Sequence, residues 1–186
     1  MQWDLLLVQE AQLAPASHLY AELGRAKVQA RPGQLGPDGC ARVVASANLP
    51  LDAPDASRVQ HFIWYPGGRS SWRIFNCYGR VEATVAARNE TSAMVRACAA
   101  EADARRKTPA LIAGDLNAGP EELGCSFVLG IQGWSDLGGA TPTTMASLHP
   151  RRIAWLMANP AMQRHRIRAG ARWDSGVPTH SCNGQI

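Results

Sequence analysis

The stretch LIAGDLNAGP, at positions 111–120, constrains the fold more than any other part of the sequence. Its apolar start is typical of the end of a strand buried in a sheet. Asp115 and Asn117 follow at once, and Gly119 and Pro120 close the stretch. A carboxylate and a carboxamide, two positions apart, therefore follow directly after a buried strand. The residue types also suit an ordinary turn, because Asp, Asn and Gly all favour turns.

A second apolar run that ends in a carboxylate lies near the start of the sequence. Residues 3–10, WDLLLVQE, predict a buried strand with Gln9 and Glu10 at its C-terminal end. Strand ends hold side chains rigidly, and carboxylate oxygens are ligands that Mg²⁺ prefers. One carboxylate can hold the ion, while a second takes a proton from an attacking water that Asn117 orients. We therefore expect Glu10 and Asp115 to meet at a shared cation.

The other predicted elements mix helices with strands. An apolar stripe at helical spacing predicts a helix over 82–106, which ends in basic residues that suit the helix dipole. The stripe consists of Ala87, Thr91, Met94, Val95, Cys98, Ala99 and Ala102. The further predictions are a helix at 17–24, a helical first turn at 120–122, a hairpin of strands 58–65 and 72–79 joined by a long loop, and strands at 40–46, 110–114, 151–158 and 165–173. This order predicts an α/β protein with helices packed on sheets that are not purely parallel.

Composition limits the class of protein. A chain of 186 residues fits a single domain over 1–186, and 46% hydrophobic with 18% charged residues is a globular composition. No apolar run reaches the roughly 18 residues of a membrane span, and no export signal is visible, so we expect an intracellular protein without a membrane partner. The five cysteines are scattered and contain no CxxC pair. That spacing argues against a disulfide framework or a zinc site and predicts a reducing compartment.

The net charge of +4 is unevenly distributed. Residues 151–172 contain six arginines and no acidic residue. A guanidinium group can donate paired hydrogen bonds to phosphate oxygens, which makes Arg151 and Arg152 candidate substrate-binding residues. The alternative is a solvated basic face with no specific ligand.

Seven short motifs follow one another in a fixed order along the chain: WDLLLVQE, FNCYG, LIAGDLNAGP, GWSD, ATPTT, RRIAWLM and VPTHS. Together they resemble the endonuclease/exonuclease/phosphatase superfamily, which includes pancreatic-type deoxyribonuclease, abasic-site endonucleases and the endonucleases of non-LTR retroelements. LIAGDLNA and the basic balance are most similar to the retroelement branch. The resemblance implies a four-layer α/β sandwich, in which two mixed sheets pack face to face and helices lie outside.

The resemblance also implies a role for each matched residue. Glu10 corresponds to a metal-binding glutamate and Tyr78 to a tyrosine near the scissile phosphate. Asp115, also a metal ligand here, corresponds to the aspartate that activates or orients the water. Asn117 corresponds to the asparagine that stabilises the transition state, and His180 to the histidine that polarises the phosphoryl oxygen. The implied cofactor is Mg²⁺, with Mn²⁺ as an alternative.

Three departures from the family pattern predict weakened activity. Ala154 stands where the family has the aspartate that orients the histidine, and Thr179 stands where it has the aspartate before the histidine. The family's first strand is expected to be missing, because Met1 falls on the second. Asp174 could reach His180 only through a tight bend, because six extended residues span about 20 Å. Losing one group that stabilises a transition state typically costs ~10²–10³ in rate.

The sequence therefore predicts a Mg²⁺-dependent phosphodiesterase, a retroelement-type DNA endonuclease domain with weakened activity. DNA is the expected partner ahead of RNA, the protein is expected to be monomeric, and a eukaryotic retroelement origin would place it in the nucleus. Two alternatives remain. One is a degenerate fragment that binds nucleic acid or nothing without cleaving it. The other is a phosphoesterase that acts on a small or lipid phosphate.

Overall fold

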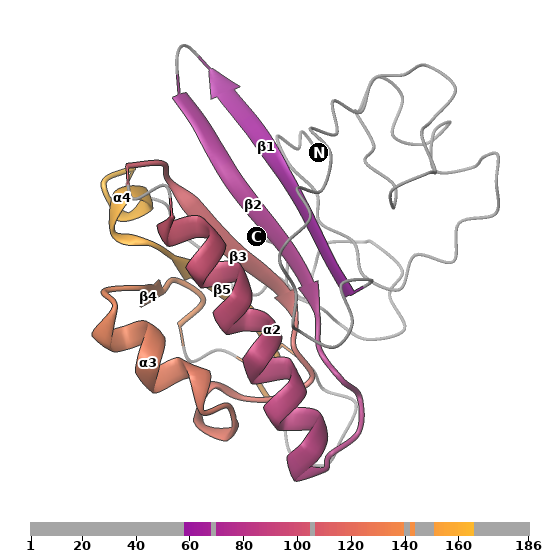
Figure 1. Cartoon of the computed structure of the whole chain (residues 1–186). Coiled ribbons are helices and arrows are strands. Elements are labelled where there is room, and N and C mark those ends of the chain that lie inside the picture. Colours follow the sequence, from indigo (N-terminus) through magenta and orange to yellow (C-terminus); the bar gives the residue numbers. More distant parts are fainter. Residues whose placement is uncertain (1–57, 68–69, 105–106, 140–141, 144–150, 166–186) are drawn as a thin grey trace, which may run out of the picture.

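A mixed five-stranded sheet forms the centre of the structure (Figure 1). The computed structural model of the chain describes residues 58–67, 70–104, 107–139, 142–143 and 151–165. The strands are β1 (Val59–Gly67), β2 (Ser70–Tyr78), β3 (Ala110–Asp115), β4 (Ser135–Asp136) and β5 (Ala154–Ala158), in the spatial order β1-β2-β3-β5-β4. The helices are α2 (Val85–Asp103), α3 (Cys125–Ile131) and α4 (Pro160–Gln163), and η2 (Pro120–Glu122) is a 3₁₀ turn. Among the strands of the described residues, only β2 and β3 pair in parallel, and the other neighbours are antiparallel.

The predicted hairpin is present, with a shorter turn than expected. β1 and β2 pair antiparallel from Val59 opposite Cys77 to Gly67 opposite Ser70, with a register shift between Trp64 and Gly67. Residues 66, 67, 70 and 71, which the sequence places between the predicted strands, thus belong to β1 and β2. The ladder hydrogen bonds of the neighbouring strand override the local turn preference of these residues.

The helix α2 connects β2 to β3 and makes their parallel pairing possible. Thr84 caps its start, because the hydroxyl oxygen accepts a hydrogen bond of 3.2 Å from the backbone N–H of Ala87. Every residue of the predicted stripe is buried. The helix runs from Val85 to Asp103, so it is shorter at both ends than the prediction over 82–106. The basic end predicted to suit the helix dipole is wrong, because the last turn of α2 contains no basic residue.

Both faces of the sheet are buried. One face packs under α2 and α3 through a cluster that includes Phe75, Ile112 and Trp155. The other face carries a second cluster that includes Ile74, Leu156 and Met162 of α4. All six residues of β3 are buried, as its continuous apolar run predicts. A sheet buried on both sides suits an inner layer, but the described residues contain no second sheet, so the four-layer sandwich stays a prediction.

Several predicted elements lie outside the described residues. They are the strands at 3–10 and 40–46, the helix at 17–24 and nearly all of the strand at 165–173. Of the strand predicted at 151–158, the structure places residues 154–158 in β5. The helical turn predicted at 120–122 is the 3₁₀ turn η2.

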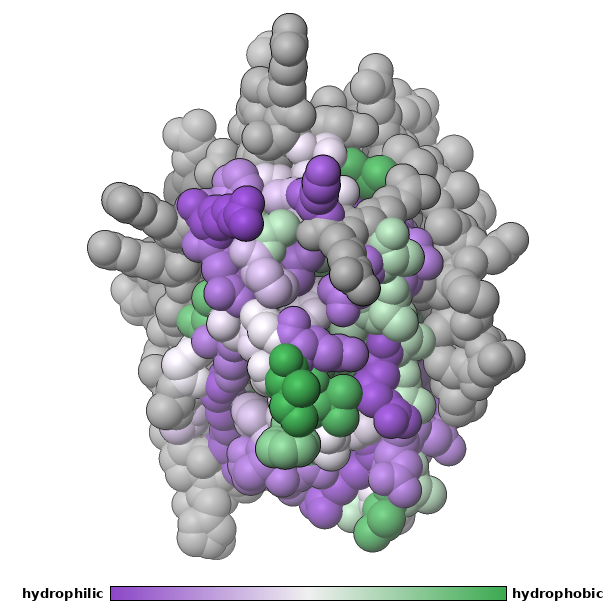
Figure 2. Space-filling model, turned by 60° about the vertical axis from the view of Figure 1, so that its left-hand side comes forward, coloured by the Kyte–Doolittle hydropathy of each residue, from purple (hydrophilic) through white to green (hydrophobic). Residues whose placement is uncertain are grey.

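The short helix α3 buries Cys125 and Leu129 and exposes Phe127, Val128 and Ile131. On the side of the molecule that carries this helix, an apolar patch is surrounded by hydrophilic side chains (Figure 2). In the part of the chain that the structure describes, no helix has the length and apolar character of a membrane span.

A buried arginine ties α2 to β2. The Arg73 side chain is 4% exposed, and its Nη2 lies 2.6 Å from Oε1 of Glu101. Its Nη1 donates to the Glu101 carbonyl oxygen at 2.7 Å, and its Nε donates to Nε2 of His61 at 3.1 Å. A guanidinium buried to this extent needs its carboxylate partner, since an unpaired buried charge is costly.

We expect Glu101→Ala to lower the free energy of unfolding by about 3 kcal/mol, because it strands the buried charge of Arg73. Glu90→Ala is the matched control on the same helix. Glu90 pairs with Arg80 at 2.7 Å and its side chain is 39% exposed, so its loss should cost less than about 1 kcal/mol. Urea denaturation measures both. Equal losses in the two variants would contradict the distinction.

Candidate active site at the ends of β2 and β3

Parallel pairing brings the C-terminal ends of β2 and β3 together. Tyr78 is the register partner of Asp115, and Asp115 is in turn the register partner of Ala154 on β5. Register partners point to the same face of a sheet, so these positions form one row. Asn76 lies one pleat before Tyr78 on that face and is buried. Two residues predicted from separate motifs, Tyr78 and Asp115, are therefore neighbours.

Asp115 is held in a tight turn at the end of β3. The residue is 7% exposed, and its Oδ1 accepts a 2.9 Å hydrogen bond from the backbone N–H of Asn117. Asn117 has φ 55°, in the left-handed region that asparagine tolerates. The turn interpretation of GDLN is thus correct, and the turn also fixes both candidate catalytic side chains.

The segment after β2 packs directly on this turn. The Gly79 N–H donates to the Asp115 carbonyl oxygen at 2.7 Å, and Nδ2 of Asn117 donates to the Gly79 carbonyl oxygen at 3.2 Å. A Cβ on Gly79 would lie 2.1 Å from the Leu116 carbonyl oxygen, so only glycine allows this approach. The YG and GDLN motifs, which are far apart in sequence, form one backbone unit.

An arginine missed by the sequence analysis lies beside this unit. The Arg58 guanidinium carbon is 5.2 Å from the centre of the Tyr78 ring, within cation–π range, and its Nη1 donates to the Gly79 carbonyl oxygen at 3.0 Å. The hairpin register could have located it, because pairing Val59 with Cys77 sets the preceding residue beside Tyr78.

The start of β5 holds the turn from the other side. The Leu116 N–H donates to the Ile153 carbonyl oxygen at 2.9 Å, and the Trp155 indole N–H donates to the Ala118 carbonyl oxygen at 2.8 Å. Thr143 in turn holds this part of the chain, since its hydroxyl oxygen accepts hydrogen bonds of 2.9 Å from the N–H groups of residues 153 and 154. Thr143 belongs to the ATPTT motif, which the sequence did not link to any contact.

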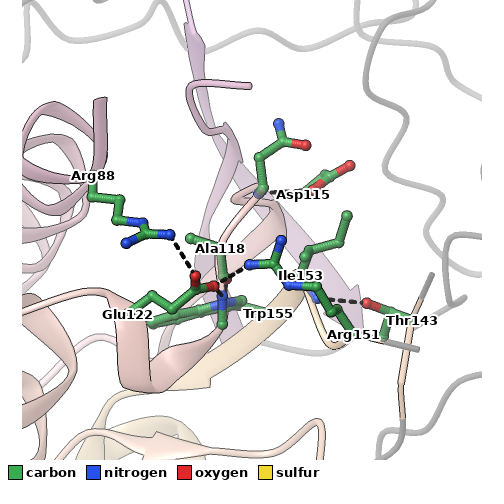
Figure 3. A network of polar contacts seen from close by, with 10 residues as sticks. Arg88, Asp115, Ala118, Glu122, Thr143, Arg151, Ile153 and Trp155 are labelled. Carbon is green, nitrogen blue, oxygen red and sulfur yellow. Dashed lines mark hydrogen bonds and ion pairs between the residues drawn. The ribbon is translucent and has the colours of Figure 1, made fainter. Parts of the chain in front are cut away.

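Glu122 closes the turn at its far end, between two arginines (Figure 3). Its Oε2 accepts the Gly119 N–H at 2.7 Å, and its Oε1 accepts Nη2 of Arg88 at 2.7 Å. Arg151 pairs with the same carboxylate. The Gly119 N–H and the two guanidinium groups hold the pKa of Glu122 below its usual range.

This lowered pKa predicts how stability depends on pH. The Glu122 carboxylate stabilises the folded state above its unfolded-state pKa of about 4.3, and that contribution is lost as the pH falls through the lower folded-state pKa. We therefore expect wild type to be more stable than Glu122→Gln at neutral pH, by a margin that narrows in acid. Urea denaturation from pH 7 down to pH 3 measures the margin. A margin that widens in acid would contradict the prediction.

The two arginines predicted to bind substrate are both paired with carboxylates. Arg151 pairs with Glu122, and Arg152 forms a two-pronged pair with Asp136. Asp136 lies in β4. Arg88 and Arg151 share the single carboxylate of Glu122. Substrate binding by Arg151 and Arg152 stays a prediction.

Two predicted site residues, Glu10 and His180, lie outside the described residues, as does Thr179. The expected meeting of Glu10 with Asp115 therefore stays a prediction. In the described stretches, no group of three or more His, Cys, Asp or Glu side chains gathers around a metal position. The side-chain oxygens of Asp115, Asn76 and Asn117 are hard donors, the type of ligand that Mg²⁺ or Mn²⁺ prefers. Asp115 is therefore suited to be one metal ligand.

Comparison with known proteins gives a family for this arrangement. The sequence matches the Endonuclease/Exonuclease/phosphatase family over residues 2–175. The chain belongs to this family. No curated protein sequence is matched.

Three solved structures are similar to parts of the chain. A mannosyl-6-phosphatase from Bacteroides thetaiotaomicron matches with a TM-score of 0.38 and 18% identity, over 50% of this chain and 38% of its own. An endonuclease/exonuclease/phosphatase family protein from the same organism matches with a TM-score of 0.40 and 20% identity, over 54% of this chain and 40% of its own. Truncated TDP2 from Caenorhabditis elegans matches with a TM-score of 0.42 and 18% identity, over 54% of this chain and 45% of its own. The matched part thus spans less than half the length of each of these structures.

Proposed function

We propose that the protein is a Mg²⁺-dependent phosphodiesterase that cleaves DNA, in the manner of a retroelement-type endonuclease domain. Family membership supports cleavage of a phosphoester bond. The observation that carries the proposal is the register pairing of Tyr78 with Asp115, with Asn117 tied to the same backbone unit. Three side-chain types suited to hydrolysis of a phosphate ester therefore lie at one end of the sheet.

The proposed roles follow from the chemistry of each group. Asp115 orients the attacking water and accepts its proton, because its carboxylate is fixed by the Asn117 N–H and lies at a strand end. Asn117 and Tyr78 contact phosphoryl oxygens, where charge develops in the transition state. A divalent cation bound at Asp115 would supply neutralisation of phosphate charge. The six arginines over residues 151–172 would add salt-dependent affinity for a polyanion.

One observation favours a second candidate, a nucleic-acid-binding domain without catalysis. Ala154 lies directly opposite Asp115, so the described row contains one carboxylate where the family resemblance implies two. A methyl group there supplies neither a ligand nor a hydrogen-bond acceptor. The phosphoesterase acting on a small or lipid phosphate is a further alternative within the same fold.

Plasmid nicking separates these candidates. Supercoiled plasmid, a chromogenic phosphomonoester and a chromogenic phosphodiester are each incubated with the purified chain in Mg²⁺ or EDTA. Asp115→Asn protein, purified in parallel, reports any contaminating nuclease. We expect nicking that requires Mg²⁺ and is lost in the variant. Hydrolysis of the monoester alone would support the small-phosphate alternative, and a salt-sensitive gel shift without any hydrolysis would support the binding domain.

A further inference from the structure

The 3₁₀ turn η2 is too short to be stable by itself, yet it closes the catalytic turn. It contains only the three residues Pro120–Glu122, and a helical segment of this length is marginal without tertiary contacts. Three of its contacts meet at the carboxylate of Glu122, whose side chain is 19% exposed. A further hydrogen bond of 2.7 Å joins the Ser126 hydroxyl to the Pro120 carbonyl oxygen. Glu122 is therefore the residue of η2 that connects it to α2 and to the segment before β5.

Glu122 connects three separate parts of the chain at one carboxylate (Figure 3). Its hydrogen bond to the Gly119 N–H at 2.7 Å closes η2 on itself. Its Oε1 accepts from Arg88 of α2 at 2.7 Å, and Arg151, which precedes β5, pairs with its Oε2. The end of the catalytic turn is thus anchored to a helix on one side and to the approach of a neighbouring strand on the other.

Other hydrogen bonds hold the residues between Asp115 and Gly119. The Leu116 N–H donates to the Ile153 carbonyl oxygen, the Asn117 side chain donates to the Gly79 carbonyl oxygen, and the Trp155 indole donates to the Ala118 carbonyl oxygen. Asn117 has the left-handed backbone conformation, which is easily lost when a turn loosens. The hydrogen bond from its N–H to Oδ1 of Asp115 then loses its alignment as well.

We propose that Glu122 is a positioning residue, which sets the orientation of Asp115 and Asn117 by anchoring the end of their turn to Arg88 and Arg151. This inference rests on the proposed hydrolase function. It also gives Arg88, a residue outside every motif, a defined role. Because displacement of a catalytic group by about 1 Å can cost ~10²-fold in rate, loss of this anchor should lower turnover without removing any group that touches the substrate.

The test measures turnover and local order in the same variants. For Glu122→Ala we expect kcat to fall about 10- to 100-fold and the Asn117 amide to exchange its hydrogen faster, while exchange in the core of β3 is unchanged. Glu122→Gln keeps one acceptor for the Gly119 N–H and should lose less. Glu90→Ala removes another glutamate–arginine pair of 2.7 Å and should change neither quantity.

The outcomes separate this inference from the proposed function. Unchanged kcat in Glu122→Ala, whether or not the Asn117 amide exchanges faster, would overturn the positioning role while leaving the hydrolase intact. Absence of hydrolysis by the wild-type protein would overturn the proposed function itself. If Glu122→Ala fails to fold, Arg88→Ala, which removes one anchor and leaves η2 closed by Glu122, should show the same two changes to a smaller extent, and their absence would overturn the inference.

Discussion

Asp115→Asn is expected to lower Mg²⁺-dependent hydrolysis at least ~10²–10³-fold while leaving the fold intact. Asparagine has nearly the shape of aspartate and keeps an oxygen that can accept the hydrogen bond from the Asn117 N–H. In the wild-type protein this bond joins the Asn117 nitrogen to Oδ1 of Asp115 at 2.9 Å. What it loses is the negative charge that would accept a proton and attract a divalent cation. Steady-state rates with plasmid or a phosphodiester, together with a thermal melt, measure the two effects separately.

Asp103→Asn provides the matched control for Asp115→Asn. Asp103 ends α2, shortly before β3 begins at Ala110, whereas Asp115 is the last residue of β3. The same chemical change at the opposite end of the sheet should leave both rate and melting temperature near those of wild type. A variant at Asp115 that retains more than about a tenth of the wild-type rate would contradict its assignment as the catalytic carboxylate.

Gly114→Ala is expected to give the largest loss of stability of any single methyl added to the described chain. Gly114 has φ 140°, which alanine rarely adopts, and its Cβ would lie 1.9 Å from the carbonyl oxygen of Cys77. That oxygen belongs to the backbone of the neighbouring strand β2, so it cannot move aside as a flexible side chain would. Strain and overpacking together predict a loss of at least about 3 kcal/mol, a large part of typical domain stability.

Gly130→Ala is the control for this substitution. Gly130 lies inside α3, and a Cβ there would meet nothing within 4 Å. Alanine is the better helix former by about 1 kcal/mol, so this variant should be as stable as wild type or slightly more stable. Urea denaturation of the two variants gives the comparison. A Gly114→Ala protein as stable as Gly130→Ala would show that β2 and β3 do not approach as closely as described.

The sequence by itself determined the elements that have a clear pattern of apolar residues, either a continuous run or a stripe at helical spacing. The apolar run at 110–114 predicted β3, and the stripe from Ala87 to Ala102 predicted the buried face of α2. Both predictions were correct because each pattern is local and its hydrophobic residues must leave water together. The GDLN motif was also predicted from the sequence, both as a turn and as a candidate site.

Only the tertiary structure decided which residues meet. Parallel pairing of β2 with β3 made Tyr78 the neighbour of Asp115, and antiparallel pairing of β1 with β2 set Arg58 beside Tyr78. The contact of Tyr78 with Asp115 has no local signature, and that of Arg58 with Tyr78 needs the exact register of the hairpin, because strand register depends on the partner strand. Likewise, nothing in the sequence joins Glu122 to Arg88 and Arg151, which lie 34 and 29 positions away. A guanidinium group can pair with a phosphate or with a carboxylate, and only the fold determines whether its partner is a substrate or another side chain of the protein.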